Sequence, residues 1–390
     1  MNSQSGRLFL QIPGPANIPH RVLQAMESPL LNHRGAEFAE ICKALLPKLK
    51  AVFQTEQGTP VIFPSSGSGA MESALVNTLS PGDGVLVFAI GNFSAMFGEI
   101  SDHLGFSTKV VELPLGGGIP PERVFEELKA DRAGKFKAIV AIHNETATGV
   151  TTDISAIRQA IDRAGHSGLF LVDTISGLGC MDFRFDEWGV DVAITGSQKG
   201  LLLPPGLGLV CLNEKALQAY RTASSPRHYF DWGAIIEYNR RGIFPYTPAT
   251  QLLFGLDTAL DMLLEEGLEK IFARHARAAE GVRRAVTAWG LKTVALTREV
   301  ASNSLTAVRV PTEIDSDALI AHTEKHLNLA LGNGLGELSG KAFRIGHLGV
   351  INDLEILATL GGVEMGLHRM GASLQLGSGV AACQEWFLGE

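Results

Sequence analysis

Three features of the sequence have residue types that could do chemistry: a Ser/Gly-rich turn, an acidic residue and a lysine. The turn PSSGSGAMES covers residues 64–73, Asp173 is the acidic residue near the end of the otherwise apolar run GLFLVDT, and Lys199 lies in TGSQKGLLLPPG. A turn between a strand and a helix suits a phosphate, because unpaired N–H groups and the positive end of the helix dipole face an anion there. A buried Asp173 would need a cation or a donor, such as a protonated ring nitrogen. The amine of Lys199, followed at once by apolar residues, could form an imine with an aldehyde.

Each feature also has an ordinary explanation. Residues 64–73 could be a plain Gly-rich turn, since neither GxxxxGK[ST] nor GxGxxG spacing is present. Asp173 could cap the helix that follows, and Lys199 could be solvated as most lysines are. In this order along one sheet, however, the three features together describe a site for pyridoxal 5′-phosphate. The phosphate would lie in the turn, the ring nitrogen at Asp173 and the aldehyde on Lys199.

Alternating strands and helices are expected to position these residues. Between residues 58 and 212, short β-rich apolar runs alternate with longer amphipathic ones, which predicts an α/β fold with a mostly parallel seven-stranded sheet. The expected strands begin at residues 60, 84, 107, 136, 168, 191 and 206. Helices are expected at 70–79, 93–104, 121–130 and 154–164. Ligands of such sheets bind beyond the carboxyl ends of the strands, where the polar turns lie.

A change of pattern after residue 249 predicts a smaller C-terminal α/β domain. The expected elements are a long helical segment that breaks near Gly267, strands at 304–310 and 341–347, and a helix at 354–369. We therefore predict three parts, which are an N-terminal segment near the active site (1–20), a large cofactor-binding domain (21–265) and a small domain (266–390).

Composition argues against several classes of function. The chain has 390 residues, of which 45% are hydrophobic, and a formal net charge of −8 without a basic run, so nucleic acid is not an expected partner. No apolar run approaches the roughly 18 residues of a membrane helix, and no signal peptide is recognisable, so no membrane partner is expected. The four cysteines lie far apart without CxxC spacing. We therefore expect no metal site and no disulfide framework, and a cytoplasmic location.

The same motifs resemble a known family. SGSG before a helix, the strand VDT, SGLG after it and TGSQKGLLLPPG are similar to the class V, fold type I aminotransferases, in particular the alanine-glyoxylate and serine-glyoxylate group. PGPANIP, HNETATGV, FDEWGVD, FRIGHLG and LGSGVAA extend the resemblance over nearly the whole chain. The resemblance implies the fold type I architecture and pyridoxal 5′-phosphate as cofactor, and the serine-glyoxylate branch is the most similar.

For the cofactor phosphate, the resemblance implies a set of contacts around the Ser/Gly turn. Ser68, Gly69 and Ala70 match the phosphate turn of the family, in which some members have a histidine at the third position. Gln198 would help to hold the phosphate. Thr247, in the loop FPYTP, matches a residue that donates to the phosphate of the neighbouring subunit, which implies a homodimer with shared active sites.

For the cofactor ring and the substrate, the resemblance implies four further positions. Phe93 matches an aromatic residue, often tryptophan, that stacks on the ring, although it could also be a core residue at a helix start. Ile175 would pack on the opposite face and Thr146 would lie near the phenolic oxygen. Arg344, in FRIGHLG, matches the arginine that binds the substrate α-carboxylate in a forked geometry, although an arginine there could also lie on the surface.

These expectations together describe a two-step transamination. Asp173 would keep the ring nitrogen protonated and Lys199 would move the proton, with serine or alanine as amino donor and glyoxylate as the oxo acid that becomes glycine. Aspartate is the alternative donor and would need a second cation, for which Arg34 and His33 are candidates.

Other classes of protein remain possible from the residues alone. A lyase or racemase would use the same lysine and differ only in later proton transfers. A cysteine desulfurase would need a mobile nucleophilic cysteine, and Cys383 has no motif around it. A non-enzymatic binding or scaffold protein would bind no cofactor at Lys199. A Rossmann dehydrogenase is not expected, because GxGxxG is absent. Whether dimers pair into tetramers stays open.

Overall fold

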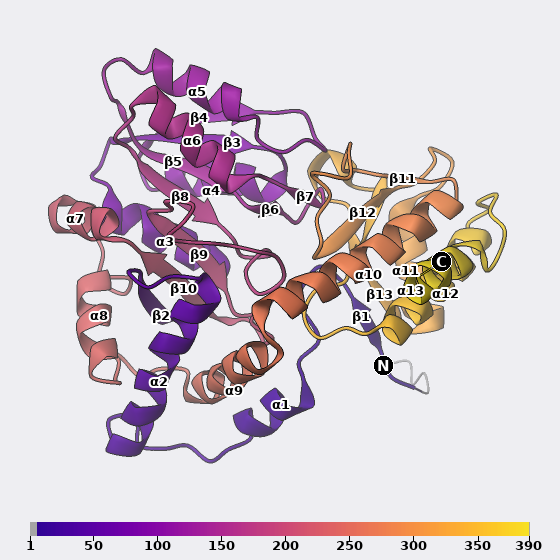
Figure 1. Cartoon of the computed structure of the whole chain (residues 1–390), viewed down its shortest axis with the longest axis horizontal. Coiled ribbons are helices and arrows are strands. Elements are labelled where there is room, and N and C mark those ends of the chain that lie inside the picture. Colours follow the sequence, from indigo (N-terminus) through magenta and orange to yellow (C-terminus); the bar gives the residue numbers. More distant parts are fainter. Residues whose placement is uncertain (1–5, 390) are drawn as a thin grey trace.

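The large domain is built on a seven-stranded sheet (Figure 1). The computed structural model describes residues 6–389. In sheet order the strands are β2 (Thr59–Ser65), β10 (Gly206–Leu212), β9 (Val192–Gly196), β8 (Leu169–Asp173), β5 (Phe136–Ile142), β3 (Gly84–Ala89) and β4 (Ser107–Glu112). The five strands from β9 to β4 are parallel, and β10 runs antiparallel to both of its neighbours. The predicted α/β fold with a mostly parallel seven-stranded sheet is therefore confirmed.

Helices cover both faces of this sheet, because its central strands are apolar on both sides. Along β3, Val85 and Val87 face one layer of helices, while Leu86 and Phe88 face the other. The first layer contains α3 (Gly67–Thr78), α4 (Asn92–His103), α7 (Glu214–Thr222) and α8 (Trp232–Arg240). The second contains α2 (Ala36–Phe53), α5 (Pro121–Ala130), α6 (Ile154–Ala164) and α9 (Thr250–Glu266), with α1 (His20–Met26) packed on α9.

The sequence also marks where several of these helices begin and end. Asp153 caps α6, since its side chain accepts a hydrogen bond from the backbone N–H of Ala156 at 2.9 Å. Helix α9 ends at Glu266, and Gly267 has a φ of 87°, which favours glycine there. The long helical segment after residue 249 is thus broken where the sequence predicts.

The small domain is a five-stranded sheet with helices packed against it. Its strand order is β1 (Phe9–Gln11), β13 (Leu329–Asn333), β14 (Ala342–Gly346), β12 (Leu305–Arg309) and β11 (Lys292–Thr293). Its helices are α10 (Leu268–Ala288), α11 (Ser316–Leu327), α12 (Asp353–Arg369) and α13 (Ser378–Leu388), and a short 3₁₀ turn, η1, spans Gly336–Leu338. Strand β1 pairs in parallel with β13, so the N-terminal segment crosses to the small sheet (Figure 1). The domain boundaries at residues 20 and 265 stay a prediction.

A short hairpin connects the large sheet to the small domain. Strands β6 (Asn144–Glu145) and β7 (Val150–Thr151) follow β5 and pair antiparallel. The backbone N–H of Thr151 donates to the carbonyl of Val300, and that of Ser302 donates to the carbonyl of Gly149. The hairpin therefore lies against a loop of the small domain. Within residues 6–389, no helix combines the length and the apolar character needed to span a membrane.

Candidate active site

Lys199 lies in a buried turn directly after β9. Its side chain is 9% exposed, and its Nζ donates a hydrogen bond to the backbone carbonyl of Pro13. The leucines that follow, 201–203, are buried and form an apolar wall behind the turn. The pKa of Lys199 is lowered to about 8, mainly by burial and secondly by the positive charge of Arg344. Part of the amine is thus neutral near physiological pH, as a nucleophile or base requires.

Asp173 is the last residue of β8 and lies in the same cavity as Lys199. It is 3% exposed, and its Oδ1 accepts a hydrogen bond from the backbone N–H of Ile175 at 2.7 Å. Burial raises the pKa of Asp173 to about 7, and the negative charge of Glu145 acts in the same direction. Such a carboxyl group is ready to pair with a cationic group in the cavity.

The Ser/Gly turn opens helix α3 at one end of this cavity. Ser66 caps the helix, and its Oγ accepts a hydrogen bond from the backbone N–H of Gly69 at 3.3 Å. A Cβ at Gly67 would lie 2.5 Å from Cδ1 of Ile175, so a larger residue in the turn would require the end of that side chain to move. The start of α3, where the sequence predicts an anion site, thus lies in the wall of this cavity, with Ser66, Gly67 and Ser68 among the lining residues.

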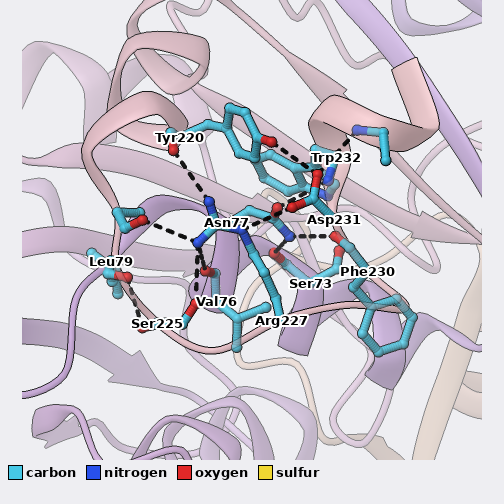
Figure 2. Close-up of polar contacts among 12 residues, drawn as sticks. Ser73, Val76, Asn77, Leu79, Tyr220, Ser225, Arg227, Phe230, Asp231 and Trp232 are labelled. Atoms are coloured by element: carbon cyan, nitrogen blue, oxygen red, sulfur yellow. Dashed lines mark hydrogen bonds and ion pairs between the residues drawn. The ribbon is translucent and has the colours of Figure 1, made fainter. Parts of the chain in front are cut away.

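Helix α3 is held at its other end by a network of polar contacts (Figure 2). Asn77 Nδ2 donates to the carbonyl of Phe230 at 2.6 Å, and Asn77 Oδ1 accepts from the backbone N–H of Trp232 at 3.0 Å. Arg227 Nη1 donates to the carbonyl of Val76 at 3.1 Å. These contacts fix α3 to the segment between α7 and α8, and with it the position of the Ser/Gly turn.

Residues of the β6–β7 hairpin close another side of the cavity. Asn144 Nδ2 donates to Ser176 Oγ at 2.7 Å and to Ser304 Oγ of the small domain at 3.0 Å. Thr146 Oγ1 donates to Ser176 Oγ at 2.8 Å. Asn144, Thr146 and Ser176 all line the cavity. This buried polar network fixes the hydroxyl of Thr146 and joins the cavity wall to the small domain.

Arg344, on β14, lines a second cavity of about 230 Å³ beside the first. It is 8% exposed, its Nε donates to the carbonyl of Asn333 at 2.7 Å, and its Nη1 donates to the carbonyl of Thr146 at 3.0 Å. Nη2 has no hydrogen bond within the part of the chain that the structure describes. Burial lowers the pKa of Arg344 to about 10, and Glu145 opposes this. The guanidinium is thus aimed by two backbone carbonyls and keeps donors free for a carboxylate.

The structure brings most of the predicted residues together. The first cavity is lined by Ser68, Phe93, Thr146, Asp173, Ile175, Gln198 and Lys199, and three of these, Phe93, Thr146 and Lys199, also line the second cavity with Arg344. Gly69 and Ala70 lie behind the turn, where the N–H of Ala70 bonds to the carbonyl of Ser66. Thr247 is exposed and lines neither cavity of its own chain.

Other candidates lie outside both cavities. Arg34 and His33, the proposed second cations, line neither cavity of this chain. Cys383 is fully buried on α13 in the small-domain core, and the other three cysteines are buried and free. A mobile nucleophilic cysteine is therefore not available at this position.

Several lining residues are not predicted by the sequence patterns. Pro13 and Gly14 line the second cavity, and Asn144 and Ser176 line the first. The polar run HNETAT, directly after a buried strand, is a signal that could have identified Asn144. Pro13 contributes a backbone carbonyl, for which the residue type gives no signal.

Comparison with known proteins finds a family model that matches the chain, and similar proteins whose activities are known from their names. A family model described as aminotransferase class-V matches residues 8–336. Serine–glyoxylate aminotransferase of Arabidopsis thaliana is 48% identical over 382 residues, which are 98% of this chain and 95% of that protein. L-aspartate–glyoxylate aminotransferase of Paracoccus denitrificans is 45% identical over 376 residues, or 96% of this chain and 95% of that protein. The crystal structure of pyridoxamine-pyruvate aminotransferase from Mesorhizobium loti has a TM-score of 0.93 and 28% identity, and the match covers 100% of this chain and 99% of that one.

Proposed function

Because the chain belongs to the class-V aminotransferase family, we propose that it uses pyridoxal 5′-phosphate to transfer the amino group of serine to glyoxylate. The single observation on which this rests is that Lys199 lines both cavities, next to Asp173 in one and to Arg344 in the other. An amine that must act on both a cofactor and an amino acid needs this position. The serine–glyoxylate relative at 48% identity supports the choice of substrates.

The residues of the first cavity fit this cofactor. Among the described residues, the amide oxygen of Gln198 is buried without a hydrogen-bond partner. With the amide turned over, its NH₂ group would take this position and would donate to a phosphate oxygen. The N-terminus of α3 with Ser68 suits the phosphate, and the buried Asp173 suits a protonated ring nitrogen. Phe93 and Ile175 supply apolar surfaces for the faces of the ring. Bound there, the cofactor supplies an aldehyde that accepts an amino group and a ring that withdraws electrons.

Lys199 is the proposed acid–base group. Its Nζ would hold the aldehyde carbon until an amino acid arrives, and would then take the proton from the α-carbon of the donor. The lowered pKa of about 8 suits both tasks, because a neutral amine is needed for each. Asp173 would stabilise positive charge on the ring nitrogen throughout, which keeps the ring electron-withdrawing.

Arg344 is the proposed partner of the substrate α-carboxylate. Two backbone carbonyls orient its guanidinium, and Nη2 with the second proton of Nη1 could form the forked contact that a carboxylate accepts. This anchor would place the α-carbon next to Lys199, since both residues line one cavity. The same contact would bind glyoxylate in the second half of the reaction.

The walls of the second cavity favour a donor with an uncharged side chain. Apart from Lys199 and Arg344, its lining residues are uncharged, namely Ile12, Pro13, Gly14, Phe93, Thr146, Leu331, Gly332 and Asn333. Serine or alanine needs no second cation, whereas the second carboxylate of aspartate would be left unpaired against these walls. Aspartate stays the alternative donor, because a relative at 45% identity has that activity and a partner subunit could add a cation.

We further propose a cytoplasmic homodimer in which each site is completed by the neighbour. Thr247 is exposed on its own chain and lines neither of that chain's cavities, as expected of a side chain that is offered to a partner. It would donate a hydrogen bond to the phosphate held by the partner's α3.

The function is tested by a donor screen on the purified protein loaded with pyridoxal 5′-phosphate. Serine, alanine and aspartate are each supplied with glyoxylate, and glycine is measured. We expect glycine to form fastest with serine. Higher activity with aspartate would establish the alternative donor, and no glycine with any of the three would contradict the proposal. Lys199→Ala should abolish glycine formation while circular dichroism shows an unchanged fold.

A further inference from the structure

Glu145 is a fully buried carboxylate that borders the active site without lining it. It ends strand β6, between Asn144 and Thr146, and has 0% exposed surface. It is absent from the walls of both cavities, so it contacts neither the cofactor site nor the substrate site. A charged group so deeply buried destabilises a fold unless several donors surround it.

Four hydrogen bonds converge on this carboxylate, and three of them come from the start of helix α4. Oε1 accepts from the backbone N–H of Phe93 at 3.3 Å and from that of Ala147 at 3.0 Å. Oε2 accepts from the backbone N–H of Ser94 at 2.9 Å and from the Ser94 hydroxyl at 2.9 Å. Burial raises the pKa of Glu145, and these donors oppose that effect.

Glu145 replaces the cap that helix α4 lacks. The residue at the N-cap position is Gly91, which has no side chain to accept the free N–H groups. A Cβ at Gly91 would lie 2.5 Å from Cγ of Glu145, so the glycine leaves room for the carboxylate. Glu145 of the hairpin thus caps α4, a helix that packs on the large sheet. The helix dipole also favours a negative charge at the start of α4.

The two segments that Glu145 joins both form walls of the active site. Phe93 is the second residue of α4 and Thr146 precedes Ala147 in the hairpin, and both side chains line both cavities. The carbonyl of Thr146 also accepts the hydrogen bond that aims Arg344. One carboxylate therefore fixes the distance between the aromatic wall and the segment that orients the guanidinium.

We propose that Glu145 is a positioning residue for the transamination, which holds Phe93 and Thr146 at a fixed separation by capping helix α4 from the neighbouring hairpin. The effect on turnover rests on the function proposed above. The expected loosening of the start of α4 does not rest on that function, because the cap consists only of contacts within this chain.

The first test measures the helix start in the cofactor-free protein by hydrogen–deuterium exchange. In Glu145→Gln, an amide NH₂ replaces one acceptor and faces backbone donors, so we expect faster exchange in the peptide covering residues 91–97 and unchanged exchange in α13. Glu99→Gln is the matched control, since Glu99 is exposed on the same helix. Unchanged exchange at 91–97 in Glu145→Gln would overturn the proposal.

A rescue variant separates capping from general stability. Glu145→Ala removes the carboxylate and the steric conflict at Gly91, and Gly91→Asp in that background supplies an ordinary N-cap side chain. We expect the double variant to restore slow exchange at 91–97, while the single Glu145→Ala variant exchanges fast. If Glu145 acted only through global stability, exchange would rise over the whole chain and Gly91→Asp would not reverse it.

The second test measures the kinetics of the loaded enzyme. We expect kcat/KM for the amino donor to fall about 10- to 100-fold in Glu145→Gln, because small displacements of positioning groups have effects of this size. Glu99→Gln should match the unaltered protein. Altered exchange with unchanged kcat/KM would overturn the positioning role. If the unaltered protein turned over no amino acid, the proposed function would be wrong, while the exchange experiments would still decide whether Glu145 caps α4.

Discussion

The side chains of Lys199 and Arg344 line the same cavity, although one follows a strand of the large sheet and the other lies on the small sheet. Lys199 is held by the carbonyl of Pro13, and Arg344 by the carbonyls of Thr146 and Asn333. The cavity therefore exists only when the two domains and the N-terminal segment are assembled. Its two cations are close enough to influence each other, since Arg344 lowers the pKa of Lys199.

Arg344→Lys should reduce kcat/KM for serine by about 100-fold or more, because a lysine cannot form the forked contact with a carboxylate and leaves two carbonyls without their donors. The loss corresponds to roughly 3 kcal/mol of binding in the transition state. Arg309→Lys is the control, since Arg309 is exposed on the neighbouring strand β12. Steady-state rates for both variants measure the difference, and equal rates would show that Arg344 does not bind substrate.

The amine of Lys199 should titrate well below an ordinary lysine in the cofactor-free protein. Its pKa is lowered to about 8 from 10.5, so acetylation of Lys199 by acetic anhydride should increase with pH around a midpoint near 8. Arg344→Gln removes a positive neighbour, which makes protonation easier and should move the midpoint upwards. Mass spectrometry of the labelled peptides measures both values. A midpoint near 10.5 in the unaltered protein would contradict the effect of burial.

Asp173→Asn should stabilise the cofactor-free protein at alkaline pH while abolishing activity. Burial raises the pKa of Asp173 from 3.8 to about 7, so the stability contributed by the protonated carboxyl is present in acid and is lost as the pH rises through 7. Asparagine cannot ionise and keeps an acceptor for the N–H of Ile175. At about pH 8 we expect a gain on the order of 1 to 3 kcal/mol in the free energy of unfolding. Little gain is expected below about pH 4, because the loss begins at the ordinary pKa of 3.8.

Asp191→Asn gives the opposite result and serves as the control. Asp191 is buried as well, but its carboxylate accepts hydrogen bonds from the N–H of Phe170, from Asn213 Nδ2 and from Lys215 Nζ. Loss of its charge should therefore destabilise the protein at alkaline pH. Urea unfolding at several pH values distinguishes the two carboxylates. Destabilisation by Asp173→Asn at about pH 8 would contradict the unfavourable effect of burying the Asp173 charge.

Mixed dimers test the proposed role of Thr247. A Lys199→Ala chain is inactive, and a Thr247→Ala chain should bind the cofactor weakly in its own homodimer. If Thr247 serves the partner's site, the mixed dimer contains one complete site, formed by Lys199 of one chain and Thr247 of the other. We therefore expect mixing to restore up to half of the normal activity per dimer. Activity no higher than the sum of the separate variants would show that Thr247 does not act across the interface.

The large domain could be predicted closely from the sequence, because its central strands are short, apolar on both faces and separated by amphipathic helices. Asp173 and Lys199 follow from the same pattern, since polar residues at the ends of buried strands meet at one edge of the sheet. The position of Arg344 came from the resemblance to the family, because a single arginine in a strand has no distinctive pattern.

The missed contacts depend on pairings between distant segments. Strand β1 has three residues, which is too short for a recognisable alternation, and its partner β13 lies near the other end of the chain. The hydrogen bond from Lys199 to the carbonyl of Pro13 follows from that pairing. The cap that Glu145 provides was likewise not predicted, because sequence rules for capping consider residues next to the helix, whereas this cap comes from another element.

The most direct measurement of the proposed transamination mixes the loaded protein with serine in the absence of any oxo acid acceptor. We expect one equivalent of the oxo acid derived from serine per active site, with the bound cofactor converted to its amine form, and no product in Lys199→Ala. Addition of glyoxylate should then release one equivalent of glycine. Continued production of oxo acid and ammonia without glyoxylate would indicate a lyase, and no oxo acid at all would contradict transamination from serine.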